Sequence, residues 1–187
     1  AVPGDRVRLN RHYPMEEHMP ISAAMLPEFD HEMANTRRTL DRVPDSTFDW
    51  TPHEKSPSMQ DLVSHLANLP SWVPVTVEQD DIDMAPPDGS EPPKQEAAES
   101  TAQALETFDA NVAAARVIIE AANDEKWMET WSLLNGGEVV FAMPKVAVFR
   151  SFIMNHMIHH RAQLTVYLRM NDVPLPALYG PSADEQE

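Results

Sequence analysis

Three histidines could together bind a metal ion, because two of them share one helical pattern and the third lies in another. His156 and His160 are four residues apart, a spacing that places both imidazoles on one face of an α-helix, one turn apart. His65 lies in a second helical pattern, inside an otherwise apolar stripe. Three neutral imidazoles from two packed helices can hold a borderline transition metal and leave a coordination position open, as a catalytic metal requires. We therefore predict a divalent metal site with His65, His156 and His160 as its ligands.

The spacing of His156 and His160 is weak evidence for a metal when it is taken alone, and a lone core histidine is usually only hydrogen-bonded. A zincin site is ruled out because no Glu follows His156 to act as the base. Position favours a metal, since both histidines lie on the apolar face of the most apolar predicted helix, where an unpaired polar group costs about 1–3 kcal/mol. His159 lies about 100° round the helix from His160 and about 60° from His156, so we expect it away from the metal, at an interface or at the surface.

Several other polar residues near these histidines have two interpretations each. Gln163 and Tyr167 follow His160 by three and seven residues, and they are predicted either to line the same cavity or to pack in the core. Asp61, one turn before His65, either orients an imidazole or caps the helix, and we favour the cap. The remaining histidines sit in polar stretches, and we expect most of them to be exposed to solvent: His12, His18, His31 and His53.

Four helical stretches must position these residues, and apolar side chains recur in them at spacings of three and four. They cover residues 22–43, a stretch from Ser58 that Pro70 and Pro74 bend or end, residues 94–122, and residues from Pro144 to 170. Ser58 is a suitable N-cap, with Asp61 three residues later. The last stretch is the most apolar, and Phe152 belongs to its predicted inward face.

Two non-helical stretches separate these helices. Residues 75–93 are acidic and rich in proline, so we predict an exposed connector without regular structure. A connector of this length can leave the second and third helices parallel. Residues 127–143 break the helical period, and the sequence Asn135-Gly136-Gly137 between two apolar runs predicts a short hairpin.

The composition excludes several classes of function. Of the 187 residues, 14 are Lys or Arg and 30 are Asp or Glu, giving a formal charge of −16. This charge repels nucleic acids and anionic membrane surfaces. No apolar run approaches the roughly 20 residues of a membrane span, and no signal peptide is recognised, so we expect a cytoplasmic protein.

The absence of cysteine excludes disulfides and protein thiolate chemistry. Any reacting thiol must therefore come from a substrate.

The chain divides into one globular domain and two short ends. Residues 1–18 are interpreted as an irregular leader, native or added, that lies outside the fold. Residues 19–178 form the single helical domain, and residues 179–187 are expected to be a loose acidic tail.

The helical patterns and histidines resemble the DinB-like metal-dependent family, a damage-inducible four-helix-bundle family, over Met19 to Glu185. The segments that carry the resemblance are Leu26–Glu32, Trp50–Ser56, Leu62–Ala67, Asn155–Arg169, Val173–Pro176 and Tyr179–Ser182. The resemblance implies an all-α fold: a left-handed four-helix bundle, up-down-down-up, with a long connector between helices 2 and 3 and a short hairpin-like insertion before helix 4. It also implies zinc or nickel on His65, His156 and His160. Relatives include transferases and isomerases that use low-molecular-weight thiols such as bacillithiol and mycothiol, and dimers are common among them.

Three hypotheses follow for the function. In the first, the protein is a metal-dependent enzyme, a thiol S-transferase or a hydrolase, in which the metal activates a low-molecular-weight thiol or water to attack a small molecule. In the second, it is a non-catalytic metal-binding stress-response protein with a closed set of four ligands around its ion. In the third, the bundle has lost its metal and keeps hydrogen-bonded histidines. We prefer the first, and no residue is predicted as its general acid or base.

Overall fold

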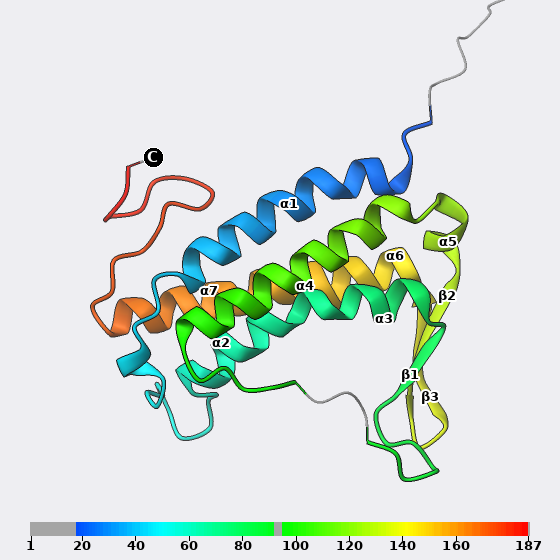
Figure 1. Ribbon diagram of the computed structural model, residues 1–187, viewed down its shortest axis with the longest axis horizontal. Helices are drawn as coiled ribbons and strands as arrows, with labels where there is room; N and C mark the ends of the chain where they lie inside the picture. Colours follow the sequence, from blue (N-terminus) through cyan, green and yellow to red (C-terminus); the bar gives the residue numbers. More distant parts are fainter. Residues whose placement is uncertain (1–17, 92–94, 187) are drawn as a thin grey trace, which may run out of the picture.

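A computed structural model describes residues 18–91 and 95–186 of the protein (Figure 1). Long helical segments make up its main layer. They are α1 (Ile21–Leu40), α2 (Met59–Asn68), α4 (Thr101–Ala121) and α7 (Asn155–Met170). A 3-10 turn (Leu69–Ser71) and α3 (Trp72–Glu78) continue the line of α2. In Figure 1, α2 and α4 run in one direction while α1 and α7 run in the other, which is an up-down-down-up order.

Local capping explains where two of these helices begin. Ser58 and Asp61 form a capping box at the start of α2, in which each side chain bonds the backbone N–H of the other at 3.0 Å. The Ser100 hydroxyl accepts from the backbone N–H of Gln103 at 3.2 Å at the start of α4. This helix begins at Thr101, seven residues later than the predicted Lys94, and residues 95–100 before it are not helical.

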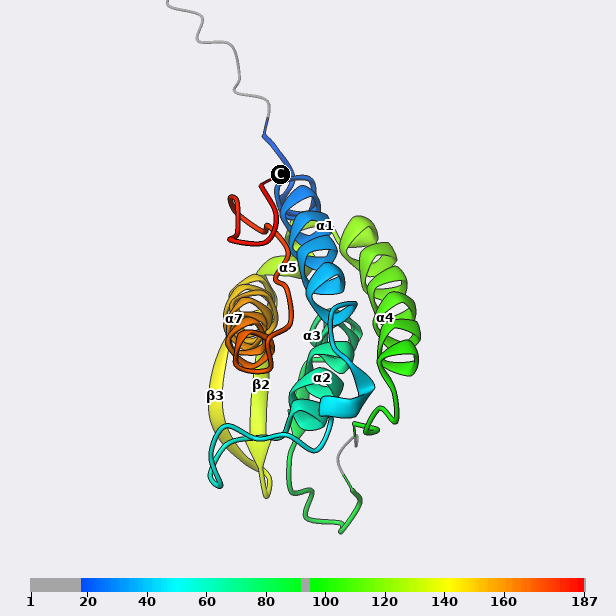
Figure 2. The same cartoon turned by 90° about the vertical axis from the view of Figure 1, so that its left-hand side faces the viewer.

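The hydrophobic core lies between the helices, as the end-on view in Figure 2 shows. Helix α4 packs against both α1 and α2 on one side, and α7 packs against the same two helices on the opposite side (Figure 2). Each contributes fully buried side chains, among them Phe29, Leu66, Phe108 and Leu164. Burial of such side chains provides the main driving force for folding.

A short helical run leads into α7 and changes its geometry. Helix α6 (Lys145–Val148) is followed by a π-helical segment (Phe149–Met154), and α7 continues from Asn155. Single π turns inside helices often accompany functional sites. The buried side chains Phe149, Ile153 and Met157 recur every fourth residue, whereas Phe152 is 44% exposed. Our prediction that Phe152 faces the core is therefore wrong.

A three-stranded sheet closes one end of the bundle. Its strands are β1 (Asp81–Asp83), β2 (Thr130–Asn135) and β3 (Glu138–Pro144), with α5 (Asp124–Met128) just before β2. The strand order is β1-β2-β3, with β1 parallel and β3 antiparallel to β2. Gly136 and Gly137 have φ values of 66° and 81° at the hairpin turn, the left-handed conformation that two-residue hairpin loops require.

The prediction of an all-α four-helix bundle is wrong, because this sheet is part of the fold. The predicted connector without regular structure contains the last four residues of α3 and all of β1, and it pairs through Ile82 with Leu133 of the hairpin. Ile82 is buried in a second hydrophobic cluster with Trp131 and Val148. The neighbouring acidic residues made this strand look like a loop, but they bond within the fold: the Asp83 carboxylate accepts from Gly136 N at 3.0 Å.

The chain end after α7 is held against the bundle. Glu185 forms ion pairs with Arg38, at 3.0 Å, and with Arg42, and Asp184 pairs with Arg169. Residues 179–186 are thus bonded to α1 and α7, unlike the loose tail that we predicted. Of the predicted leader, residues 1–17 lie outside the described residues, as does residue 187. No helix in the described ranges is long and apolar enough to cross a membrane.

The bundle also buries charged groups that the sequence analysis did not place. Arg161 is 1% exposed and Glu32 5%, and their side chains meet at 2.6 Å. The Tyr179 hydroxyl donates to the same Glu32 carboxylate at 2.7 Å. Lys145 is fully buried, and its Nζ donates to the Val77 carbonyl at 3.0 Å. Buried charges are tolerated when they are paired in this way.

Candidate metal centre

Two packed helices bring the three predicted histidines together. His65 projects from α2, and His156 and His160 project from α7, which contacts α2 along the bundle. All three imidazoles are half-buried. The three candidate ligand atoms lie within 4.8 Å of one another. The histidines that the sequence predicts as ligands are therefore adjacent in the fold, although 91 residues separate His65 from His156.

The imidazoles face one another through the same ring atom. Nε2 of His156 lies 2.7 Å from Nε2 of His160 and 3.3 Å from Nε2 of His65. The ring centroids are 4.5 to 4.9 Å apart. Three nitrogen atoms of this kind converging on one point form a donor set suited to a divalent transition metal.

The opposite ring nitrogen of each imidazole has an oxygen partner. His65 Nδ1 faces Gln95 Oε1 at 3.2 Å, and His160 Nδ1 faces Gln163 Oε1 at 2.7 Å. His156 Nδ1 faces the Phe152 carbonyl oxygen at 3.3 Å. A carbonyl oxygen only accepts, so each Nδ1 carries the proton and donates it.

This arrangement leaves the three Nε2 lone pairs without protons between them. Two bare nitrogens 2.7 Å apart, as in His156 and His160, repel each other unless a cation lies between them. Hydrogen bonds from the distal ring nitrogen to an oxygen are the usual support of a metal-bound histidine, because they fix its tautomer and orientation. The residues present therefore fit a divalent metal ion.

The protonation of these imidazoles points the same way. Burial lowers the pKa of the His65, His156 and His160 imidazoles below its usual range, and mutual repulsion among the histidines lowers it further. The Gln95 and Gln163 side chains oppose this shift at His65 and His160. The neutral form, which is the form that binds metal, is thus favoured near pH 7.

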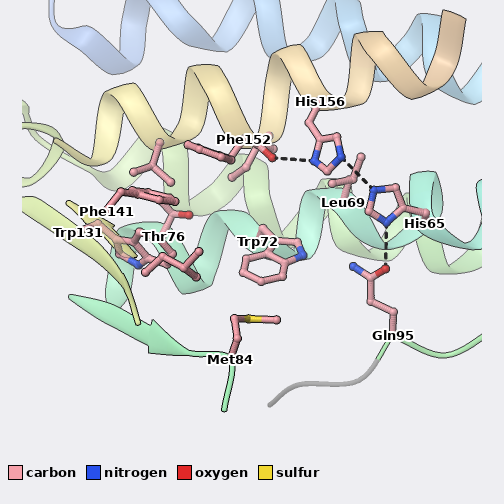
Figure 3. A pocket seen from close by; sticks show the side chains of 13 residues that line it. His65, Leu69, Trp72, Thr76, Met84, Gln95, Trp131, Phe141, Phe152 and His156 are labelled. Carbon is pink, nitrogen blue, oxygen red and sulfur yellow. Dashed lines mark hydrogen bonds between the residues drawn. The ribbon is translucent and has the colours of Figure 1, made fainter. Parts of the chain in front are cut away.

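Two hollows meet at the histidines. One, with a volume of about 240 Å³, is lined mainly by aromatic and aliphatic side chains and reaches His65 and His156. The other, of about 540 Å³, contacts all three histidines and includes Asp61, Ser64 and Glu96. Figure 3 shows the first hollow, with His65 and His156 at one end and Trp131 and Phe141 at the other.

The structure also gives a role to several predicted neighbours. Gln163 accepts a hydrogen bond from His160 Nδ1. The spacing of three residues predicted that Gln163 lies near His160 but left its role open. Tyr167 packs in the core against Trp50, at 5.2 Å between ring centroids, and its hydroxyl donates to the Pro57 carbonyl. Asp61 is a helix cap, as favoured.

The other described histidines are not part of the three-histidine ligand group. His159 is exposed, and its ring meets the edge of His160 at 5.0 Å. His18, His31 and His53 are exposed as well, whereas His12 lies outside the described residues.

Sequence reasoning missed Gln95 and the aromatic wall of the smaller hollow. Gln95 belongs to the non-helical stretch before α4, 30 residues from His65, and no periodicity links the two. The wall uses side chains from the hairpin, such as Phe141, and its position depends on the unpredicted strand β1.

Comparison with known proteins identifies the family. The family model described as "DinB family" matches residues 15–187, and the protein belongs to this family. A DinB-like protein from Bacillus cereus ATCC 10987 has a similar structure, with a TM-score of 0.63 and 17% identity, covering 86% of this chain and 98% of the other. A DinB-like protein from Bacillus subtilis has a TM-score of 0.63 and 20% identity, covering 88% and 99%. At these identities the similarity concerns the fold. No curated protein matches the sequence.

Proposed function

We propose that the protein is a metal-dependent enzyme in which His65, His156 and His160 hold one zinc or nickel ion. The observation that carries this proposal is the convergence of three Nε2 atoms whose rings are fixed through Nδ1. When bound, such an ion acts as a Lewis acid that makes a thiol or a water molecule a stronger nucleophile near neutral pH. The proposed reaction is transfer of a low-molecular-weight thiol to a small molecule, or hydrolysis of one.

The protein's own residues have defined tasks in this proposal. Gln95, Gln163 and the Phe152 carbonyl hold the three imidazoles in the tautomer that exposes Nε2. The two hollows give a co-substrate and a substrate separate approaches to His65 and His156, which line both. The thiol has to be a co-substrate, because the chain contains no cysteine. The charge of −16 supports a small-molecule substrate over a nucleic acid.

The second candidate is a non-catalytic metal-binding stress-response protein, which would be expected to surround its ion with protein ligands. Within the described ranges, the group of metal-ligating side chains consists of the three histidines, with no Asp, Glu or fourth His among them. Three protein ligands beside open hollows are the pattern of catalytic rather than structural sites. This observation favours the enzyme.

Elemental analysis of the protein purified without an affinity tag tests the metal site. We expect about one zinc or nickel ion per chain in the wild type. His65→Ala and His160→Ala should both lose it, while His159→Ala, which changes an exposed neighbour on the same helix, should keep it. A screen of thiol-transfer and hydrolytic reactions with the loaded protein would follow. A wild type that is metal-free and takes up neither added zinc nor added nickel would refute the proposal.

A further inference from the structure

The smaller hollow beside the histidines has the chemistry of a binding pocket for an apolar ring. Trp72, Trp131, Phe141 and Phe152 contribute aromatic walls, and leucine, isoleucine, valine and methionine side chains complete most of the remainder. Figure 3 shows Trp72 and Met84 between the aromatic end of the hollow and His65. Concave, mostly apolar pockets with a few polar groups at one end are typical small-molecule sites.

The arrangement of the aromatic rings indicates the shape of the ligand. The Phe141 and Phe152 rings are stacked, with centroids 4.8 Å apart and planes 9° apart, and Trp131 meets Phe141 at 6.1 Å. The Trp131 indole N–H is already engaged, because it donates to the Val75 carbonyl at 3.2 Å. The wall therefore offers flat carbon surfaces, against which a planar ring can stack.

The lining also excludes formal charge from the inner part of the hollow. Among the described residues that line it, there is no Lys, Arg, Asp or Glu. The polar members are His65, His156 and Gln95 at the histidine end and Thr76 at the aromatic end (Figure 3). A charged group placed against the Trp131 end would lose its hydration without gaining an oppositely charged partner, which is costly. The volume of about 240 Å³ suits a fused or substituted ring system rather than a large ligand.

We infer that this hollow, which we call the ring pocket, binds the neutral aromatic part of the substrate and leaves its reacting atom at His65 and His156. The position of the reacting atom rests on the proposed function, whereas binding of the ring itself needs no metal. The substrate class is therefore an uncharged aromatic electrophile, and the second hollow is left for the co-substrate.

A matched pair of fluorescent probes tests the inference. N-phenyl-1-naphthylamine is neutral, and 8-anilino-1-naphthalenesulfonate has the same ring skeleton with an added sulfonate. Both brighten in apolar surroundings, so a titration gives the dissociation constant of each. We expect saturable binding of the neutral probe and at least about tenfold weaker binding of the anionic one, which is the loss that an unpaired charge imposes.

Substitutions place the binding in the ring pocket. Phe152→Ala and Phe141→Ala should each weaken the neutral probe about threefold to tenfold by removing a stacking surface. Met84→Glu, at a 43% exposed position of the lining, should weaken it as well and tests the pocket even if an alanine variant folds poorly. The matched control is Val140→Ala, which changes a 59% exposed side chain next to Phe141 outside the pocket and should leave the affinity unchanged.

The same samples separate this inference from the proposed function. His160 does not belong to the lining of the ring pocket, as far as the structure describes it, so His160→Ala should lose the metal and keep the neutral probe. A wild type that binds the neutral probe but takes up neither added zinc nor added nickel would support the ring pocket and refute the metal proposal. Equal affinity for the two probes, no saturable binding, or affinity unaffected by all three pocket variants would overturn the ring pocket, whatever the metal content.

Discussion

Replacement of His156 by alanine removes the imidazole whose Nε2 contacts the Nε2 atoms of both other histidines. In the metal-free protein, the change deletes one hydrogen bond, from Nδ1 to the Phe152 carbonyl at 3.3 Å. It also removes two close nitrogen contacts, at 2.7 and 3.3 Å. The loss of a weak bond and the relief of repulsion oppose each other, so the free energy of unfolding should change by no more than about 1 kcal/mol.

The loaded protein should respond very differently. A ligand that binds only the folded state at a concentration of 100 times its dissociation constant adds about 2.7 kcal/mol to stability. For a domain of this size, that corresponds to a rise of roughly 5–11 °C in Tm. We expect this rise in the wild type and its disappearance in His156→Ala, because two imidazoles cannot replace the three-nitrogen donor set.

Differential scanning calorimetry of chelator-treated protein, with and without added zinc or nickel, measures both quantities. His159→Ala is the control, since this exposed imidazole lies on the same helix outside the cluster. Equal destabilisation of the metal-free and loaded forms by His156→Ala would refute the ligand assignment, and so would a metal-dependent rise in Tm that survives the substitution.

Further perturbations test the surrounding structure. Burial lowers the pKa of the three histidines of the cluster in the folded state. Below the unfolded pKa of about 6.5, the unfolded state takes up protons that the folded state still resists, so the metal-free protein should lose stability as the pH falls toward the lower folded values. Above this pH its stability should be complete. Urea titrations between pH 5 and 8 measure this change, and a flat profile would contradict it. Arg161→Met should cost about 3–5 kcal/mol by leaving Glu32 buried without its cation, and adding Glu32→Gln should recover part of this loss in urea unfolding. Asp83→Ala removes the carboxylate that accepts from Gly136 and Gly137, so amide hydrogen exchange at these two glycines should accelerate; unchanged protection there would contradict a holding role for Asp83.

Periodicity in the sequence was enough to predict the helices and the adjacency of the histidines. A histidine pair four residues apart on an apolar helix, with a third inside another apolar stripe, leaves little choice about which helices meet. Capping chemistry also located the start of α2, because the Ser58–Asp61 pair acts within four residues. These signals are local, and local signals can be read without knowing the fold.

The missed features depend on contacts between distant segments. Strand β1 is only three residues long and places Ile82 between two aspartates, so its composition resembles a solvated loop until β2 pairs with it. The bond between Gln95 and His65, and the buried pair of Glu32 with Arg161, likewise join residues that no periodic pattern connects. From the sequence alone, a polar side chain that pairs inside the core cannot be distinguished from one that faces solvent.

The π-helical segment also bears on how the histidines can be located in relatives. A π turn closes its hydrogen bonds over five residues where an α turn uses four, so it absorbs one residue without lengthening the helix by a regular step. Deleting one residue, such as the exposed Ser151, would return this segment to regular α-helix and leave His156 on nearly the same face relative to Lys145. For any relative that lacks this extra residue, counting residues from the hairpin would misplace the ligands, so alignments should be anchored on the histidines.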